Sequence, residues 1–179
     1  MIGLNVLLWV FIVIFAIIGY ARGLKRELLV TSAVILALYV ITILESYVPL
    51  IRDTAAKSVG GTIFWMRIFI VGFLVFFGYQ VPNIPRVAAN NRFKVESQQD
   101  AILGLIMGAI NGFLLFGTVW YYMDRAGYPF SMITRPEVTS EAGKAATALI
   151  KILAPHWLTT PVIYFVVAVA LAFILIVFV

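Results

Sequence analysis

The 179-residue chain contains no cysteine, one histidine and few charged residues, which make up 12% of the sequence. The lack of cysteine excludes disulfides, thiolate nucleophiles and cysteine-ligated metals. A single histidine, His156, excludes a multi-histidine metal site. The small charged fraction also argues against an ordinary soluble domain, because about a quarter of the residues in such domains are charged and help to cover their surface.

Sequence patterns that accompany catalysis are missing as well. The chain has no Gly-x-Ser-x-Gly elbow, no phosphate-binding glycine loop and no His-Glu-x-x-His pair. Its apolar runs also lack the aspartate pair that an intramembrane aspartyl protease needs. We therefore expect a protein that is not an enzyme and that has no catalytic, cofactor-binding or metal-binding residues.

Apolar side chains, in contrast, make up 63% of the sequence. A helix that crosses the hydrocarbon layer of a bilayer needs about 20 mostly apolar residues. Five runs have that length or nearly so, and they cover residues 2–20, 28–50, 62–79, 101–123 and 160–179. The first run lacks the basic start and cleavage site of a signal peptide, so we expect it to be retained. The sequence predicts an all-α integral membrane protein with about five transmembrane helices.

The polar stretches divide the chain into three parts. Residues 1–123 form a predicted four-span membrane core, residues 124–157 an extramembrane loop, and residues 158–179 the fifth transmembrane helix. Helical spacing over residues 140–153 predicts an amphipathic helix in the loop, with Ser140 or Thr139 capping its start and Pro155 ending it. One side of that helix is apolar: Ala142, Ala145, Ala146, Leu149, Ile150 and Leu153. The helix either packs on the protein's own extramembrane surface or lies in the headgroup plane.

The basic residues, which outnumber the acidic ones and give a net charge of +5, predict the orientation. They lie between the apolar runs, as at the ends of membrane spans, so we expect a lipid bilayer rather than nucleic acid as the partner. The two sides carry equal numbers, but the short link at residues 19–27 holds the densest cluster. Because basic residues close to span ends are retained in the cytoplasm, we place the N-terminus outside and the C-terminus inside.

Small residues recur along the fourth span. Gly104, Gly108 and Gly112 are four residues apart and leave a groove on one face of the helix, with Asn111 beside it. Such a groove lets another helix approach closely, and an amide beside it can bridge helices. The pattern predicts tight helix packing, either within the chain or against a second copy or a partner.

One charged residue lies inside an apolar run. Arg67 is in the third span, where a charge is costly unless its side chain snorkels to the surface or is paired. Its nearest plausible partner is Glu45, near the same end of the second span. A structural ion pair, snorkelling and a polar lining for a pathway are all consistent with this position.

Aromatic residues gather at the ends of two spans. Trp120, Tyr121 and Tyr122 end the fourth span, while Trp157 and Tyr164 flank the start of the fifth. Because amphipathic rings prefer the headgroup level, we expect these side chains to be interface anchors.

Two motifs resemble a known family. The first two spans are joined by the basic link Gly19-x-x-Arg22-Gly23-x-x-Arg26-Glu27, which predicts an antiparallel helix hairpin. This link resembles the glycine-arginine-glycine turn of the colicin V production protein family of bacterial inner-membrane proteins. The run Asp100-x-x-Leu103-Gly104-x-x-x-Gly108-x-x-x-Gly112 is similar to that family's second signature, at the start of its fourth span. The similarity covers about residues 1–155.

The resemblance implies a four-span inner-membrane core with the N-terminus outside, and a role in bacteriocin production or export and in envelope homeostasis. Three features depart from the family pattern. Asn5 stands where an aspartate is usual, Asn111 stands where an arginine usually precedes the last glycine, and the fifth span is additional. The first two changes remove charges, and the added helix suggests that it docks against another surface.

Three functions are consistent with these features. The leading hypothesis is a non-catalytic membrane protein of the colicin V production type, which acts in export or envelope maintenance through helix contacts. The second is an accessory structural subunit of a larger membrane complex, such as an energy-transducing one, docked by the charge-free fifth span. The third is an oligomeric channel or transporter, which the few polar groups in the spans disfavour. We expect further copies of the chain or other membrane-protein subunits as protein partners.

Overall fold

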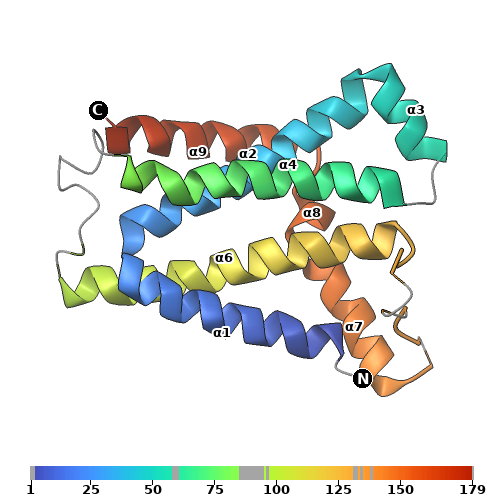
Figure 1. Cartoon of the computed structure of the whole chain (residues 1–179), viewed down its shortest axis with the longest axis horizontal. Helices are drawn as coiled ribbons and strands as arrows, with labels where there is room; N and C mark the ends of the chain where they lie inside the picture. Colours follow the sequence, from blue (N-terminus) through green and yellow to red (C-terminus); the bar gives the residue numbers. More distant parts are fainter. Residues whose placement is uncertain are drawn as a thin grey trace.

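The computed structural model describes residues 3–57, 61–84, 95, 97–130, 133, 135–137 and 139–178. This part of the chain is all-helical and contains no strand (Figure 1). Four of its helices are long and apolar enough to cross a membrane: α1 (Leu4–Arg22), α2 (Leu24–Tyr47), α4 (Gly61–Gln80) and α6 (Gln98–Arg125). A fifth apolar helix, α9 (Val162–Phe178), has 17 residues and is shorter. The predicted fold class is confirmed.

Successive long helices alternate in direction (Figure 1). The turn between α1 and α2, the end of α4, the start of α6 and the end of α9 lie at one end of the bundle, which we call the junction end. The N-terminus, the end of α2, the start of α4 and the end of α6 lie at the opposite end, which we call the cavity end. The short helices α3 (Pro49–Lys57) and α7 (Glu141–Ile152) also lie toward the cavity end.

The predicted hairpin of the first two helices is only partly present. α1 and α2 run in opposite directions, but they meet at Gly23 and then separate, and α1 packs along α6 instead (Figure 1). The reason is that the small residues of α1 and α6 face each other and allow a closer approach than α2 offers. About half of the residues of α1 are exposed, and its buried residues are Leu8 and Gly19.

α2 is the central helix and packs against α4, α6 and α9. It contributes the longest row of fully buried apolar side chains: Val30, Val34, Ala37, Leu38 and Ile41. α9 covers α2 with Ile163, Val167 and Ala170, while Phe165 and Val169 on its other face are exposed. One face of the additional helix thus docks on its own chain.

Several helix boundaries differ from the predicted ones because the helices continue into the polar links. α2 begins at Leu24, directly after the glycine turn, and α6 begins at Gln98, where the Ser97 side chain accepts a hydrogen bond from the Asp100 amide. The polar segment after the second span contains the helix α3, which the sequence analysis did not predict. Side-chain capping and the conformation of glycine, rather than hydropathy, decide these ends.

The amphipathic helix is present as α7, and Ser140 caps it by accepting a hydrogen bond from the Gly143 amide at 3.0 Å. Its predicted apolar face needs a correction, because Gly143 and Ala146 are buried whereas Ala142 and Ala145 are exposed. The helix packs on α1, α6 and the short helix α8 (Ala154–Trp157), so it covers the protein's own surface. It ends at Ile152, before the predicted proline, which lies inside α8.

The aromatic residues that end α6 are not interface anchors. Trp120 is completely buried, and Tyr121 and Tyr122 are 9% and 7% exposed. The Trp120 indole donates a hydrogen bond to the Tyr128 hydroxyl at 3.2 Å inside the protein. Sequence position alone suggested the headgroup level, but the face of α6 that carries these rings is turned toward the other helices. Trp157, at 50% exposure, does face outward.

Candidate functional site

The three glycines of α6 are used in its crossing with α1. A Cβ atom added to Gly108 would lie 2.9 Å from the Gly19 Cα, and one added to Gly104 would lie 2.7 Å from the Gly23 Cα. A Cβ on Gly112 would likewise lie 2.9 Å from a backbone carbon of α1. Since real Cβ atoms do not approach other backbone atoms so closely, only glycine allows this crossing. The groove predicted from the sequence is filled by α1 of the same chain.

Gly23 forms the whole turn between α1 and α2. Its φ of +79° is in the region that favours glycine, and its amide donates to the Gly19 carbonyl at 2.9 Å. The next amide, on Leu24, donates to the Asp100 carboxylate at 2.9 Å. A carboxylate from the first turn of α6 therefore satisfies an amide at the positive end of α2. This hydrogen bond attaches the turn to α6. Arg26, in the first turn of α2, is half-buried.

Beside this turn, five polar side chains meet inside the bundle, and we call them the junction cluster: Arg22, Glu27, Thr31, Tyr79 and Asn111. Glu27 is completely buried. Its Oε2 accepts a hydrogen bond from Asn111 Nδ2 at 2.8 Å, and its backbone carbonyl accepts a second one at 2.9 Å. The Thr31 hydroxyl donates to Asn111 Oδ1 at 2.8 Å. Asn111 thus bridges α6 to α2, as its place beside the glycine face suggested.

Arg22 supplies the opposite charge in the junction cluster. Its Nε lies 2.9 Å from Glu27 Oε1, and its guanidinium lies over the Tyr79 ring, 4.3 Å from the centroid. The Nε–H does not point at the carboxylate, so this contact is an ion pair without hydrogen-bond alignment. The short distance in a medium of low dielectric constant still gives a strong attraction.

The junction cluster also contains buried polar atoms without a hydrogen-bond partner in the described chain: Glu27 Oε1, Arg22 Nη2 and the Tyr79 hydroxyl. Burying an ionisable residue at membrane depth is costly, and such residues usually have a specific role. Here the pair joins the end of α1 to the start of α2, and its two further contacts reach α4 and α6. Glu27 lies in the basic link of the sequence, and no sequence signal indicated its complete burial.

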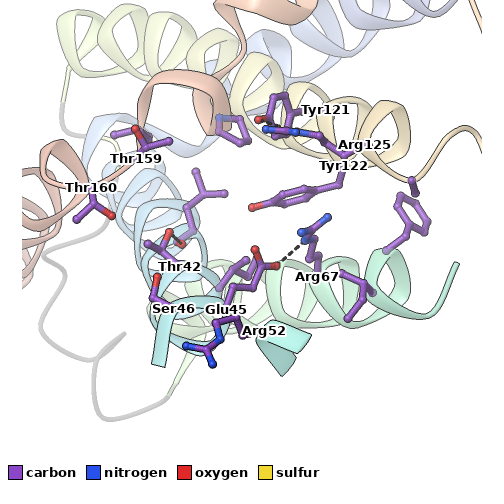
Figure 2. A pocket seen from close by; sticks show the side chains of 17 residues that line it. Thr42, Glu45, Ser46, Arg52, Arg67, Tyr121, Tyr122, Arg125, Thr159 and Thr160 are labelled. Carbon is purple, nitrogen blue, oxygen red and sulfur yellow. Dashed lines mark hydrogen bonds and ion pairs between the residues drawn. The ribbon is translucent and has the colours of Figure 1, made fainter. Parts of the chain in front are cut away.

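A second polar group surrounds a cavity of about 540 Å³ at the cavity end (Figure 2). We call it the charged cavity. α2, α3, α4, α6 and the segment before α9 all contribute to its wall. Apolar lining comes mainly from Leu38, Ile41, Ile63, Phe64 and Leu158. The polar and aromatic lining consists of Thr42, Glu45, Ser46, Arg52, Arg67, Tyr121, Tyr122, Arg125, Thr159 and Thr160.

Arg67 and Glu45 meet in the wall of the charged cavity. Arg67 Nε donates to Glu45 Oε1 at 2.7 Å, and the two side chains are 15% and 26% exposed (Figure 2). The Arg67 guanidinium also lies 4.8 Å from the centroid of the Tyr122 ring. Of the interpretations left open by the sequence, the structure shows a paired arginine that also lines a polar cavity.

Two further arginines line the charged cavity. Arg125 Nε donates to the Tyr121 hydroxyl at 3.2 Å, and Arg52 lies 3.5 Å from Asp53. The lining therefore contains three arginines and one glutamate, which gives a formal charge of +2. Arg52 and Arg125 could not be recognised as site residues from the sequence, because they lie in polar segments far apart in the chain.

Comparisons with known proteins find no matching family model, no matching curated protein and no matching solved structure. The resemblance to colicin V production proteins stays a prediction that rests on the two glycine motifs. Within the described residues, no group of three or more histidine, aspartate or glutamate side chains could hold a metal ion. Within the described membrane-spanning helices, the junction cluster and the charged cavity both bring polar side chains of several helices together.

Proposed function

We propose that this chain is a non-catalytic, multi-span membrane protein of the colicin V production type, which acts in export or envelope maintenance through helix contacts. The observation that carries the proposal is the meeting of the two glycine motifs. Gly19 and Gly23 of the first motif pack against Gly104 and Gly108 of the second, although about 80 residues separate them in the sequence. The two motifs thus describe one structural unit.

The chemistry of that unit favours an organising role over a catalytic one. The motif residues Arg22 and Glu27 pair with each other, and Asp100 holds the α2 amide. Their charges are therefore used to join α1, α2 and α6 rather than offered to a substrate. A rigid junction of this kind presents the outer faces of the helices to other membrane components in a defined arrangement.

We further propose that the protein lies in the bacterial inner membrane, with the N-terminus outside and the junction end in the cytoplasm. The support is the concentration of basic residues in the last turn of α1 and the first turn of α2, where Arg22, Lys25 and Arg26 lie within five residues.

A second candidate is an accessory structural subunit of a larger membrane complex. The observation in its favour is an exposed aromatic surface on α4, formed by Trp65, Phe69, Phe73, Phe76 and Phe77. Neighbouring rings on this surface stack on one another, for example Phe69 on Phe73 at 5.9 Å. Such a surface can face lipid or a helix of a partner subunit. Because one face of α9 already packs on α2 of the same chain, α4 is the first surface to test for docking of a partner.

Complementation tests the leading proposal. Deleting the gene from the bacterium that encodes it is expected to weaken the envelope, measured as sensitivity to detergent. The wild type and Gly72→Leu should restore resistance, because Gly72 is exposed and a Cβ atom added there would meet nothing within 4 Å. Gly108→Leu should not restore it, because its side chain would force α1 away from α6. Equal restoration by both variants, or no envelope defect on deletion, would argue against the proposal.

Biochemistry separates the alternatives. Native mass spectrometry of the gently extracted protein should show the chain alone or with copies of itself if the leading proposal is right. Stoichiometric partners that are lost on Phe69→Ala, but kept on Phe165→Ala in the exposed face of α9, would favour the accessory subunit. Movement of a solute across liposomes by the purified chain alone would refute both and support a transporter.

A further inference from the structure

We propose that the charged cavity binds a phosphate group, carried either by the headgroup of an anionic membrane lipid or by a soluble phosphate ester. This inference does not depend on the function proposed above. A volume of about 540 Å³ lies within the range of about 300–1,000 Å³ that is usual for ligand pockets. The lining combines cationic, hydroxyl and apolar groups.

Arg125 is the principal cation available to a ligand. Its Nε donates to the Tyr121 hydroxyl, and among the described residues the ion pairs do not include Arg125. The guanidinium lies 5.5 Å from the centroid of the Tyr121 ring, which orients it at the edge of the cavity. The two terminal nitrogens of a guanidinium match two oxygens of a phosphate, so an arginine held in this way suits phosphate better than a lysine would.

The remaining charges make the charged cavity selective for anions. Glu45 neutralises Arg67 at 2.7 Å, which leaves Arg52 and Arg125 as the net charge of the lining. Asp53 approaches Arg52 only to 3.5 Å, and both of these side chains are more than half exposed. Such a surface ion pair contributes little to stability, so an anion that binds Arg52 more strongly can take the place of Asp53. Counting Asp53, the site still carries a positive charge.

Hydroxyl groups lie across the charged cavity from Arg125. Figure 2 shows Ser46, Thr159 and Thr160 on one side and Arg125 with Tyr121 on the other. Thr42 lies next to Ser46 on the same helix face, but its hydroxyl donates to the Leu38 carbonyl at 2.8 Å and is not counted as a donor to the ligand. Hydroxyls are the usual companions of arginine around phosphate oxygens because they donate hydrogen bonds and add no charge. A phosphate between the two sides would therefore meet both kinds of donor.

The location favours a lipid as the source of the phosphate. The lining residues of the charged cavity come from the end of α2, the start of α4 and the end of α6. The ends of helices that cross a bilayer lie near its headgroups. The apolar lining of the charged cavity extends from this level toward the middle of α2, at Leu38. An amphiphile can place its phosphate among the arginines and its glycerol and upper chains along these apolar side chains.

The test measures binding to the purified full-length chain in detergent by native mass spectrometry. The probes are phosphatidylglycerol, zwitterionic phosphatidylcholine, inorganic phosphate and glycerol 3-phosphate. We expect phosphatidylglycerol to bind better than phosphatidylcholine, and Arg125→Gln to weaken its binding by about tenfold, the effect of one charge-assisted contact. Arg125→Lys should lose less affinity for phosphatidylglycerol than Arg125→Gln, because lysine keeps the positive charge. Arg135→Gln is the matched control, because Arg135 is exposed and lies outside the lining.

Competition identifies the source of the phosphate. If millimolar phosphate or glycerol 3-phosphate does not displace phosphatidylglycerol, the site takes a lipid; if either displaces it, the site takes a soluble ester. Equal binding of phosphatidylglycerol by the wild type and Arg125→Gln, or equal binding of the two lipids by the wild type, would overturn the proposal. If Arg125→Gln does not fold, as judged by circular dichroism, salt dependence decides: wild-type binding that added salt leaves unchanged would also overturn it.

Discussion

Replacing Gly108 by alanine tests the central feature of the fold, the close crossing of α1 and α6. The added methyl group would lie against the Phe15 carbonyl and 2.9 Å from the Gly19 Cα. Both neighbours belong to the backbone of α1, so neither can move aside as a flexible side chain does. The two helices must separate along their contact, which is the principal contact that α1 makes with the rest of the protein.

The magnitude follows from two opposing effects. Replacing glycine by alanine within a helix stabilises it by about 1 kcal/mol, because alanine restricts the unfolded chain. Forcing an extra methyl group into a well-packed contact destabilises by about 1–3 kcal/mol, and we expect the upper part of that range against a rigid backbone. Gly72 is the matched control, since it also lies inside a long apolar helix and its Cβ would meet nothing within 4 Å. The difference between Gly108→Ala and Gly72→Ala isolates the packing effect at about 2–3 kcal/mol.

The assay is equilibrium unfolding of both variants by sodium dodecyl sulfate in mixed micelles. Helix content is followed by circular dichroism, and tertiary packing by the fluorescence of the buried Trp120. Gly108→Ala should unfold at a lower detergent fraction than Gly72→Ala, with the wild type between them or close to the control. If the free energies of unfolding of the two variants agree within about 0.5 kcal/mol, the methyl group at position 108 is not overpacked, and the close crossing is refuted.

Four further changes probe the other features. Arg67→Leu should lower the amount of protein in membranes on immunoblots, because leaving its partly exposed carboxylate partner unpaired destabilises by about 1–3 kcal/mol. Asn111→Leu should destabilise by about 2–4 kcal/mol in the same unfolding assay, since it removes the hydrogen bonds to buried Glu27. Ser140→Ala should weaken the start of α7 by about 1 kcal/mol, seen as faster amide hydrogen exchange there. Burial raises the pKa of Tyr128 to about 12, so alkaline difference spectra between the wild type and Tyr128→Phe should show a midpoint near that pH.

Each of these predictions has an outcome that contradicts it. Normal accumulation of Arg67→Leu would mean that the arginine snorkels freely. Unchanged stability of Asn111→Leu would mean that the amide does not bridge α2 and α6. If the amides at the start of α7 exchange at the same rate in Ser140→Ala and the wild type, the Ser140 side chain does not stabilise the helix as a cap. A Tyr128 midpoint near 10 would show an exposed ring. Because the folded protein holds the Tyr128 proton more tightly, its contribution to stability is complete below about pH 10 and is lost as the pH rises to about 12.

The sequence was informative where the signal is local. Spans could be predicted because the length of an apolar run is a property of the run itself, and all five predicted spans correspond to apolar helices. Ser140 could be predicted as a cap, since a cap bonds an amide only three residues away. Arg67 and Glu45 could be placed at the same height from the direction of two successive spans, and the structure brings them to 2.7 Å.

The sequence was uninformative about which side of each helix is buried. In a bilayer both the lipid-facing and the protein-facing sides of a helix are apolar, so no periodic pattern distinguishes them. Trp120 therefore looked like a headgroup anchor and is instead completely buried. The same ambiguity hid the charged cavity, whose arginines come from three separate helices.

What the sequence by itself determined is the membrane class of the protein, its number of apolar helices and the residues able to form a close crossing. Only the tertiary structure decided what those residues contact. In the sequence, Glu27 is one charge among several in a short basic link. Its ion pair with Arg22 is local, but its hydrogen bonds from Asn111 exist only after α6 has returned to the junction. Burying that carboxylate alone would be prohibitively costly, so its position depends on partners that the fold brings together from both ends of the core.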